Sequence, residues 1–241
     1  MDSTLQPPAE DRLITSLPRR WDTFDAYLFD VDGTLLDCRD AVHYFAFCET
    51  LKSLSGRELN LDGVTAHGNT DIGILRDALA LAGVPESDWR PRLREACDSM
   101  CSYVENNRDQ INTEALAGTR DVLLHLRDRG AVLGVATGNL AAIGRIKLQL
   151  CSLLHYFSFF AFSDGLETRA DVYDYALGQA RALAGPNATI CAIGDTPADV
   201  RAARHHGIRI IAVTTGIHSR EQLSAERPDL CVSSLSELLT S

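Results

Sequence analysis

Two carboxylates separated by one residue, Asp30 and Asp32, follow directly after the apolar run Ala26-Tyr-Leu-Phe29. An apolar run without polar alternation is typical of a strand that is buried on both faces of a parallel sheet. Because ligands of open α/β sheets bind just beyond the carboxyl ends of the strands, we expect both carboxylates at a site for small-molecule chemistry. Two carboxylates at such a place are costly unless a cation or a proton compensates them. A solvent-exposed Asp-Gly turn at Gly33 is the alternative interpretation.

A second polar segment, Thr137-Gly138-Asn139, also follows a strand-like run and precedes a helical pattern. Its hydroxyl and the backbone N–H groups at the start of a helix are suited to holding an anionic oxygen. Thr and Asn are equally common as ordinary helix caps. This segment by itself therefore leaves both interpretations open.

A third segment, Gly194-Asp-Thr-Pro-Ala-Asp199, ends another apolar run. Asp195 is expected at the carboxyl end of a strand, and Pro197 suits the first position of the helix that follows. Asp199 would lie in the first turn of that helix, where a carboxylate also interacts favourably with the helix dipole. A few carboxylate ligands, with room left for water and a phosphate oxygen, are what Mg²⁺ prefers.

Strand-like apolar segments alternate with helical patterns along most of the chain. This alternation predicts βαβ units and therefore an α/β fold with a doubly wound, Rossmann-like parallel sheet. The expected strands are 25–29, 131–136, 157–162, 189–193, 209–213 and 230–232, and the expected helices are 118–129, 141–151, 170–184 and 197–206.

The stretch from about Cys38 to Ala117 is predicted to be helical, with candidate helices at 40–54, 71–81 and 86–106 and without a convincing strand. A connection this long is better explained as an inserted α-helical cap domain. Because it leaves the sheet directly after Asp32, it would cover the carboxyl ends of the strands and could act as a lid that excludes water. A structural elaboration without a role in catalysis is the alternative. The expected division is a flexible tail over 1–20, a core domain over 21–37 and 115–241, and a cap domain over 38–114.

The stretch Asp30-Val-Asp-Gly-Thr34 resembles the first motif of the haloacid dehalogenase-like (HAD) phosphohydrolases, and 194–199 resembles their last motif. Thr137 matches their second motif. Gly68-Asn-Thr-Asp71 is similar to a loop of the phosphoglycolate-phosphatase-like subgroup with a helical cap, although Thr70 could equally be an ordinary helix cap. The resemblance extends from about Phe24 to the end of the chain.

The resemblance implies that Asp30 is a nucleophile and that Asp32 is a general acid and base. It also implies that Mg²⁺ is bound by the carboxylates of Asp30 and Asp195 and by the backbone carbonyl of Asp32. Asp199 would not bind the metal directly but would contact the residues that do. The phosphoryl group would be held by Thr137, Gly138 and Asn139. The acid at position 32 favours phosphoryl transfer over dehalogenation, because a halide leaves without a proton and an alkoxide does not.

One position departs from the family pattern. HAD enzymes usually carry a lysine between the third and fourth strands, but the two lysines of this chain, Lys52 and Lys147, do not follow the third strand. Arg169 precedes a helix in that region and is the best candidate to replace the lysine, because a guanidinium stays cationic and can hold two phosphate oxygens at once. A surface arginine near a helix start is the alternative.

Composition restricts the class of protein further. The chain has 241 residues, of which 45% are hydrophobic, and its formal net charge of −10 argues against binding to nucleic acid or to an anionic membrane. No apolar run is long enough to span a bilayer. The seven scattered cysteines are expected to be free thiols in a reducing cytoplasm.

The sequence therefore predicts an HAD-like phosphoric monoester hydrolase. We expect it to be a Mg²⁺-dependent phosphatase for a small phosphorylated metabolite, phosphoglycolate-like or a sugar phosphate, acting through an aspartyl phosphate. A phosphomutase or other phosphotransferase is the first alternative. A non-catalytic binding protein with the same fold is the second. The sequence predicts no particular oligomeric state.

Overall fold

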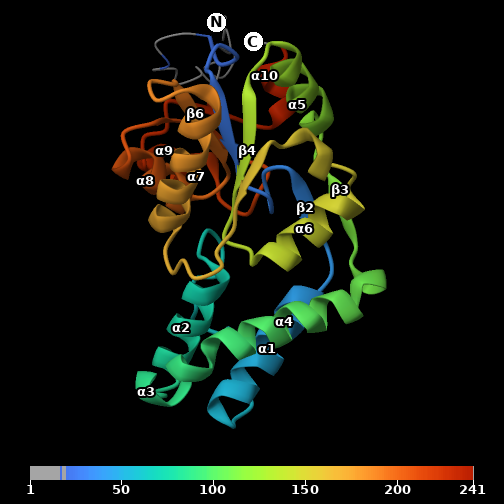
Figure 1. Ribbon diagram of the computed structural model, residues 1–241, viewed down its shortest axis with the longest axis vertical. Coiled ribbons are helices and arrows are strands. Elements are labelled where there is room, and N and C mark those ends of the chain that lie inside the picture. Colours follow the sequence, from blue (N-terminus) through green and yellow to red (C-terminus); the bar gives the residue numbers. More distant parts are fainter. Residues whose placement is uncertain (1–16, 18–19, 241) are drawn as a thin grey trace, which may run out of the picture.

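A six-stranded parallel sheet forms the centre of the computed structural model, which describes residue 17 and residues 20–240 (Figure 1). The strand order is β5-β4-β1-β6-β7-β8, so the strand that carries Asp30 at its end lies inside the sheet. The strands are β1 (Ala26–Phe29), β4 (Val132–Ala136), β5 (Phe159–Ala161), β6 (Ile190–Gly194), β7 (Arg209–Val213) and β8 (Leu230–Val232). Apart from residues 17 and 20, the expected tail over 1–20 lies outside the described residues.

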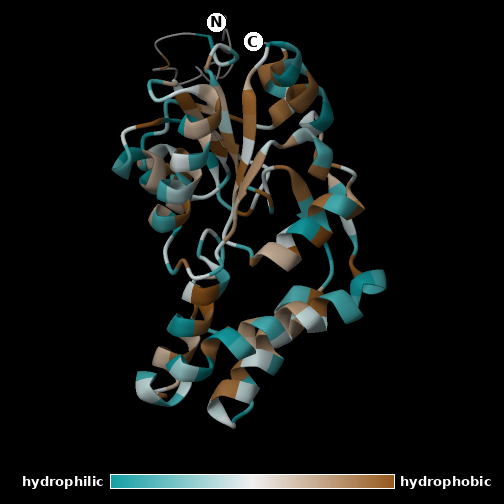
Figure 2. Ribbon diagram, in the orientation of Figure 1, coloured by the Kyte–Doolittle hydropathy of each residue, from teal (hydrophilic) through white to brown (hydrophobic). Residues whose placement is uncertain are grey.

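Helices cover both faces of this sheet. One face packs against α5 (Thr119–Asp128), α6 (Ala141–Leu150) and α10 (Leu235–Leu238), and the other against α7 (Arg169–Ala184), α8 (Pro197–His205) and α9 (Arg220–Ala225). The strands are largely apolar, whereas polar residues occupy the outer sides of the helices (Figure 2). This burial of both sheet faces is the reason why the strands lack alternation in the sequence. The predicted fold class is confirmed.

The predicted strands all occur, with small differences at their ends. The largest difference is at the third predicted strand, 157–162, of which only Phe159–Ala161 pairs as β5, an edge strand beside β4. The short 3₁₀ turn η3 (Leu154–Tyr156) precedes it. Edge strands have one pairing partner, so their ends lose ladder hydrogen bonds first.

A two-stranded antiparallel ribbon was not predicted. β2 (Leu36–Cys38) pairs with β3 (Thr113–Ala115), and β3 lies inside the stretch that was expected to be helical. Strands of three residues are too short to show a hydrophobic period. The chain passes through β2 when it leaves the sheet for the helical segment, and through β3 when it returns.

The helical segment between these two strands forms a layer of its own at the carboxyl ends of the strands of the sheet (Figure 1). It consists of α1 (Val42–Ser55), α2 (Asp71–Leu81), α3 (Glu86–Trp89) and α4 (Leu93–Asn106), with the 3₁₀ turns η1 (Arg90–Arg92) and η2 (Arg108–Gln110). The single helix expected over 86–106 is interrupted at η1, where Pro91 removes a backbone donor. We call residues 42–110 the helical layer.

An apolar core holds the helical layer together and reaches into the sheet half. Leu51, Leu75 and Met100 are buried in it, and Ile143 and Ile146 of α6 pack against them. Helix α6 therefore contacts both halves of the molecule. Among the described residues, no helix has the length and apolar character needed to cross a membrane.

Candidate active site

A cleft of about 400 Å³ lies between the carboxyl ends of the strands and the helical layer. Its walls combine residues that follow β1, β4, β6 and β7 with residues from α1 and from the loop before α2. The predicted site residues that line it are Asp30, Asp32, Thr137, Gly138, Asn139, Arg169 and Asp195. The topology thus brings together side chains that are up to 165 residues apart in sequence, because parallel strands end at one edge of the sheet.

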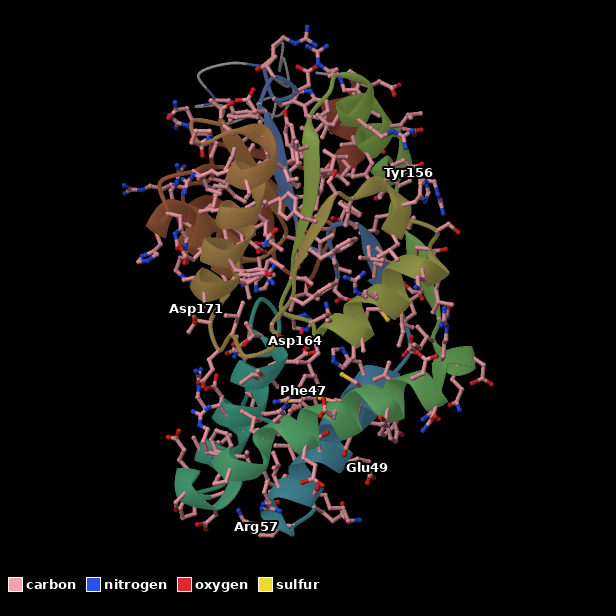
Figure 3. The ribbon with its side chains drawn as sticks, viewed as in Figure 1. Phe47, Glu49, Arg57, Tyr156, Asp164 and Asp171 are labelled. Atoms are coloured by element: carbon pink, nitrogen blue, oxygen red, sulfur yellow. The ribbon has the colours of Figure 1, made fainter. Side chains whose placement is uncertain are left out.

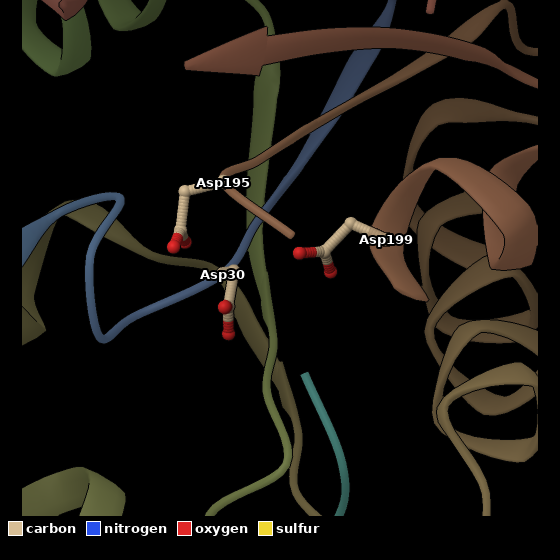
Figure 4. A group of neighbouring side chains, drawn as sticks. All are labelled: Asp30, Asp195 and Asp199. Carbon is tan, nitrogen blue, oxygen red and sulfur yellow. The ribbon is translucent and has the colours of Figure 1, made fainter. Parts of the chain in front are cut away.

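Three buried carboxylates cluster at the base of the cleft, and two of them, Asp30 and Asp195, line it. Asp30 follows β1, Asp195 follows β6, and Asp199 lies in the first turn of α8. Their carboxylate oxygens lie within 4.8 Å of one another (Figure 4). The Thr34 hydroxyl donates to Asp195 at 2.7 Å. Gly33 makes the turn between Asp32 and Thr34 possible: its φ is +81°, and a Cβ there would lie 2.4 Å from Asp195 Oδ2.

The charge of this cluster is only partly compensated. Arg169 donates to Asp199 Oδ1 through Nε at 2.9 Å and through Nη2 at 2.6 Å, and Nη2 also lies 2.7 Å from Asp30 Oδ1. Burial raises the pKa of Asp30 to about 6 even though Arg169 lowers it. Burial and the charges of Asp30 and Asp199 raise the pKa of Asp195 as well. Three buried carboxylates facing this one guanidinium leave negative charge that a bound cation would offset.

The donor set fits Mg²⁺. Asp199 is fully engaged, because it also accepts from the Tyr173 hydroxyl at 3.2 Å and from the Thr196 hydroxyl at 2.7 Å. Asp30 and Asp195 line the cleft and keep oxygens that could bind a hard cation. Asp199 is not among the residues that line the cleft, and its carboxylate instead accepts from Arg169.

A second charged cluster surrounds Asp32. Lys147 Nζ lies 2.9 Å from both oxygens of the Asp32 carboxylate, and Asn139 Nδ2 donates to Asp32 Oδ2 at 2.7 Å. Burial opposes ionisation of Asp32, but the charge of Lys147 and these hydrogen bonds outweigh it and hold the pKa of Asp32 below its usual value. Asn139 Nδ2 also lies 2.8 Å from Thr137 Oγ1, which fixes both side chains of the second motif.

Sequence reasoning missed Lys147. It lies on α6, two turns after the second motif, and its side chain is buried. A signal was present, because Lys147 follows Ile143 by four residues and shares its apolar helix face. A lysine on a buried apolar face needs a partner, since an unpaired ammonium is costly there.

The helical layer contributes to the cleft through α1 and the loop before α2. His43, Phe47, His67, Gly68, Asn69 and Asp71 line it from this side. Phe47 lies on the side of α1 that faces the sheet (Figure 3). His43 and His67 of the helical layer therefore both line the cleft.

The Gly68–Asp71 loop docks on the core through directed hydrogen bonds. The Asp71 N–H donates to the Gly138 carbonyl at 2.7 Å, and the Leu140 N–H donates to Asp71 Oδ2 at 2.8 Å. The Thr70 hydroxyl accepts from the Gly73 N–H at 2.9 Å and donates to the Glu167 carbonyl at 2.9 Å. Thr70 is therefore both a helix cap and a contact between the two halves.

A parallel sheet with helices on both faces, and with buried carboxylates at the carboxyl ends of its strands, defines an α/β enzyme of the Rossmann-like class. The family model of haloacid dehalogenase-like hydrolases matches residues 27–213. The chain belongs to this family, which confirms the resemblance found in the sequence.

Relatives and solved structures agree with this assignment. The chain is 27% identical over 216 residues to pyrophosphatase PpaX of Anoxybacillus flavithermus, covering 88% of this chain and 94% of the relative. It is 26% identical over 216 residues to a phosphoglycolate phosphatase of Pseudomonas putida, covering 88% and 77% of the two chains. The crystal structure of a hydrolase from Pseudomonas syringae shares the fold, with a TM-score of 0.68, 19% identity and coverage of 90% and 96%.

Proposed function

We propose that this hydrolase is a Mg²⁺-dependent phosphatase that cleaves a small phosphorylated metabolite through an aspartyl-phosphate intermediate. The observation that carries the proposal is the pairing of Asp30 with Asp195 on the floor of the cleft, with Asp32 directly beside them. Phosphatase and pyrophosphatase relatives support it. In this proposal Asp30, Asp195 and the Asp32 carbonyl hold Mg²⁺, which would screen the repulsion between the Asp30 carboxylate and an anionic phosphoryl group.

The first half of the reaction uses Asp30 and Asp32. An Asp30 carboxylate oxygen attacks phosphorus in line and the bond from phosphorus to the ester oxygen breaks. Asp32, which must first take up a proton against the charge of Lys147, gives that proton to the ester oxygen. In the second half Asp32 takes a proton from water, whose oxygen attacks phosphorus. Free phosphate leaves, and the Asp30 carboxylate is restored.

The remaining side chains bind and orient the phosphoryl group. The Thr137 hydroxyl, the Asn139 side chain and the backbone N–H groups around Gly138 line the cleft, where they would hold the equatorial oxygens. Arg169, with its position beside Asp30 Oδ1, would stabilise charge that builds up during transfer.

The helical layer is proposed to act as the cap that excludes water during the first half of the reaction. Its loop over Gly68–Asp71 closes one wall of the cleft. A phosphoglycolate-like ester or a sugar phosphate is the expected substrate. Because one relative is named a pyrophosphatase, pyrophosphate is a further candidate. The seven cysteines are all free, which supports the proposed location in a reducing cytoplasm.

Phosphate release from a panel of small phosphate compounds tests the proposal. The panel contains phosphoglycolate, several sugar phosphates and pyrophosphate, each with Mg²⁺ and with EDTA. We expect Mg²⁺-dependent release by the native chain and its loss in Asp30→Asn. Asp128→Asn, at an exposed position at the end of α5, is the matched control and should keep native activity. Release that persists in Asp30→Asn would refute the assigned nucleophile, and release that EDTA leaves unchanged would refute the metal.

A further inference from the structure

Lys147 makes contacts that the proposed chemistry does not yet use. Its Nζ lies 2.9 Å from Asp32 Oδ1, 2.9 Å from Asp32 Oδ2 and 2.9 Å from Asn139 Oδ1. The side chain is only 5% exposed. The ammonium is thus engaged by acceptors that the protein itself provides.

A fourth contact connects Lys147 to the helical layer. His43 Nδ1 of α1 lies 3.3 Å from Lys147 Nζ, and His43 Nε2 lies 3.3 Å from Asp71 Oδ2. The His43 ring stacks on Phe47 with centroids 4.9 Å apart. Asp71 in turn accepts from the Leu140 N–H at the start of α6. The Lys147 ammonium therefore lies where the sheet half and the helical layer meet.

Packing alone does not account for a lysine here. A methionine would fill the same space beside Ile143 and Ile146 without the cost of burying a charge. What the ammonium adds is a set of directed contacts that fix the Asp32 carboxylate between Lys147 and Asn139. Arg169 has a separate role, because it contacts Asp30 and Asp199 instead.

We propose that Lys147 is a positioning residue for Asp32. It holds that carboxylate in the orientation needed to exchange a proton with the leaving oxygen, and its contact with His43 makes this orientation depend on the docked helical layer. The inference rests on the proposed function, since it assigns Lys147 a task through the proposed general acid. A misplacement of a reacting group by about 1 Å can cost on the order of a hundredfold in rate.

A double-mutant cycle between Lys147 and Asp32 tests this inference on the best substrate of the phosphate panel. We expect Lys147→Met to lower kcat by roughly ten- to a hundredfold with little change in KM, because the lost orientation affects proton transfer more than binding. In the Asp32→Asn background, the same substitution should lower kcat by less than about threefold, because the group that it positions is already gone. Lys52→Met, the other lysine of the chain and exposed on α1, should leave kcat unchanged.

A structural readout keeps the inference testable whatever the activity. Crystal structures of the native protein and Lys147→Met should show the Asp32 carboxylate turned away from Asn139 in the variant. If Lys147→Met fails to fold, His43→Phe should show the same non-additivity with Asp32→Asn, with a smaller loss. Equal losses of kcat in the native and Asp32→Asn backgrounds, or an unmoved Asp32 side chain, would overturn the positioning role. If the native protein releases no phosphate at all, the proposed function fails, and the Asp32 orientation still decides the role of Lys147.

Discussion

Arg169 Nη2 lies 2.7 Å from Asp30 Oδ1, and both side chains are almost completely buried. The same nitrogen lies 2.6 Å from Asp199 Oδ1, so this guanidinium joins the end of β1 to the first turn of α8. These contacts support the proposal that Arg169 takes the place of the lysine that the family usually carries. The planar fork of Arg169 can serve two carboxylates at once, which a single ammonium does with less directional control.

Arg169→Ala is therefore expected to affect both stability and activity. Removing one partner of a buried ion pair leaves the other charge uncompensated and costs about 3–5 kcal/mol. We expect a drop of that size in the free energy of unfolding, measured with urea, and a loss of activity greater than that of Lys147→Ala. Arg181→Ala, in the last turn of the same helix and exposed, should change neither quantity. A larger loss of activity in Lys147→Ala would show that Arg169 does not take the place of the lysine that the family usually carries.

Gly138→Ala should separate docking of the helical layer from folding of the sheet. A Cβ at position 138 would lie 2.1 Å from the Asn69 carbonyl oxygen, so the Gly68–Asp71 loop must move away. We expect loss of most activity at high substrate concentration, with a far-UV circular dichroism spectrum like that of the native protein. Gly178→Ala on α7, where a Cβ meets nothing within 4 Å, should keep activity and gain up to about 1 kcal/mol of stability. Native activity in Gly138→Ala would show that this docked loop is not needed.

Glu167→Gln should loosen the contact between the two halves outside the cleft. Glu167 lies in the loop before α7 and pairs with Arg76 of α2 and with Arg90 of the helical layer. The side chains are about one-third exposed, so solvent screens these pairs and the effect on global stability is expected to stay below about 1 kcal/mol. Hydrogen exchange of the amides over 70–75 should accelerate in Glu167→Gln and stay unchanged in Glu221→Gln. Unchanged exchange in both variants would show that the ion pairs of Glu167 do not help to hold the helical layer on the sheet half.

The pH dependence of these ion pairs follows from the pKa of Glu167. Hydrogen bonds and charge from Arg90 and Arg76 lower this pKa below 4.5. Its contribution to docking is therefore complete above the ordinary pKa and disappears as the pH falls through the lowered one. We expect the difference in amide exchange between native protein and Glu167→Gln to vanish in strongly acidic buffer.

The raised pKa of Asp30 predicts a stability effect of the opposite sign. The unfolded chain loses the Asp30 proton near its ordinary pKa of 3.8, but the folded protein retains it up to a pKa of about 6. Between these values the folded state binds more protons, so stability falls as the pH rises toward 6. In metal-free protein, Asp30→Asn should therefore gain stability relative to the native chain on going from pH 4 to pH 7.

Urea unfolding at both pH values with EDTA measures this difference. Added Mg²⁺ should stabilise the native chain at pH 7 and have little effect on Asp30→Asn, because the ionised Asp30 carboxylate is a proposed ligand. Asp128→Asn should follow the native protein throughout. A native chain and an Asp30→Asn variant with parallel pH profiles would contradict the raised pKa.

Local sequence determined the sheet and much of the floor of the cleft. Asp30, Asp32, Asp195 and Asp199 could be located because each belongs to a short motif whose strand and turn are set by neighbouring residues. The strands were predictable because burial on both faces requires uninterrupted apolar runs. Arg169 was predicted at the site from the family resemblance and from its place before a helix after the third predicted strand, and the structure places its side chain beside Asp30.

Tertiary structure alone decided which distant groups meet these residues. Lys147, His43 and Glu167 lie outside every motif. Their partners Asp32, Asp71 and Arg76 are 115, 28 and 91 residues away in the sequence. The ribbon of β2 and β3 depends in the same way on pairing between strands too short to show a period. Short-range patterns record which face of an element is buried, but not which element covers it, because docking is set by the summed packing and hydrogen bonding of both halves.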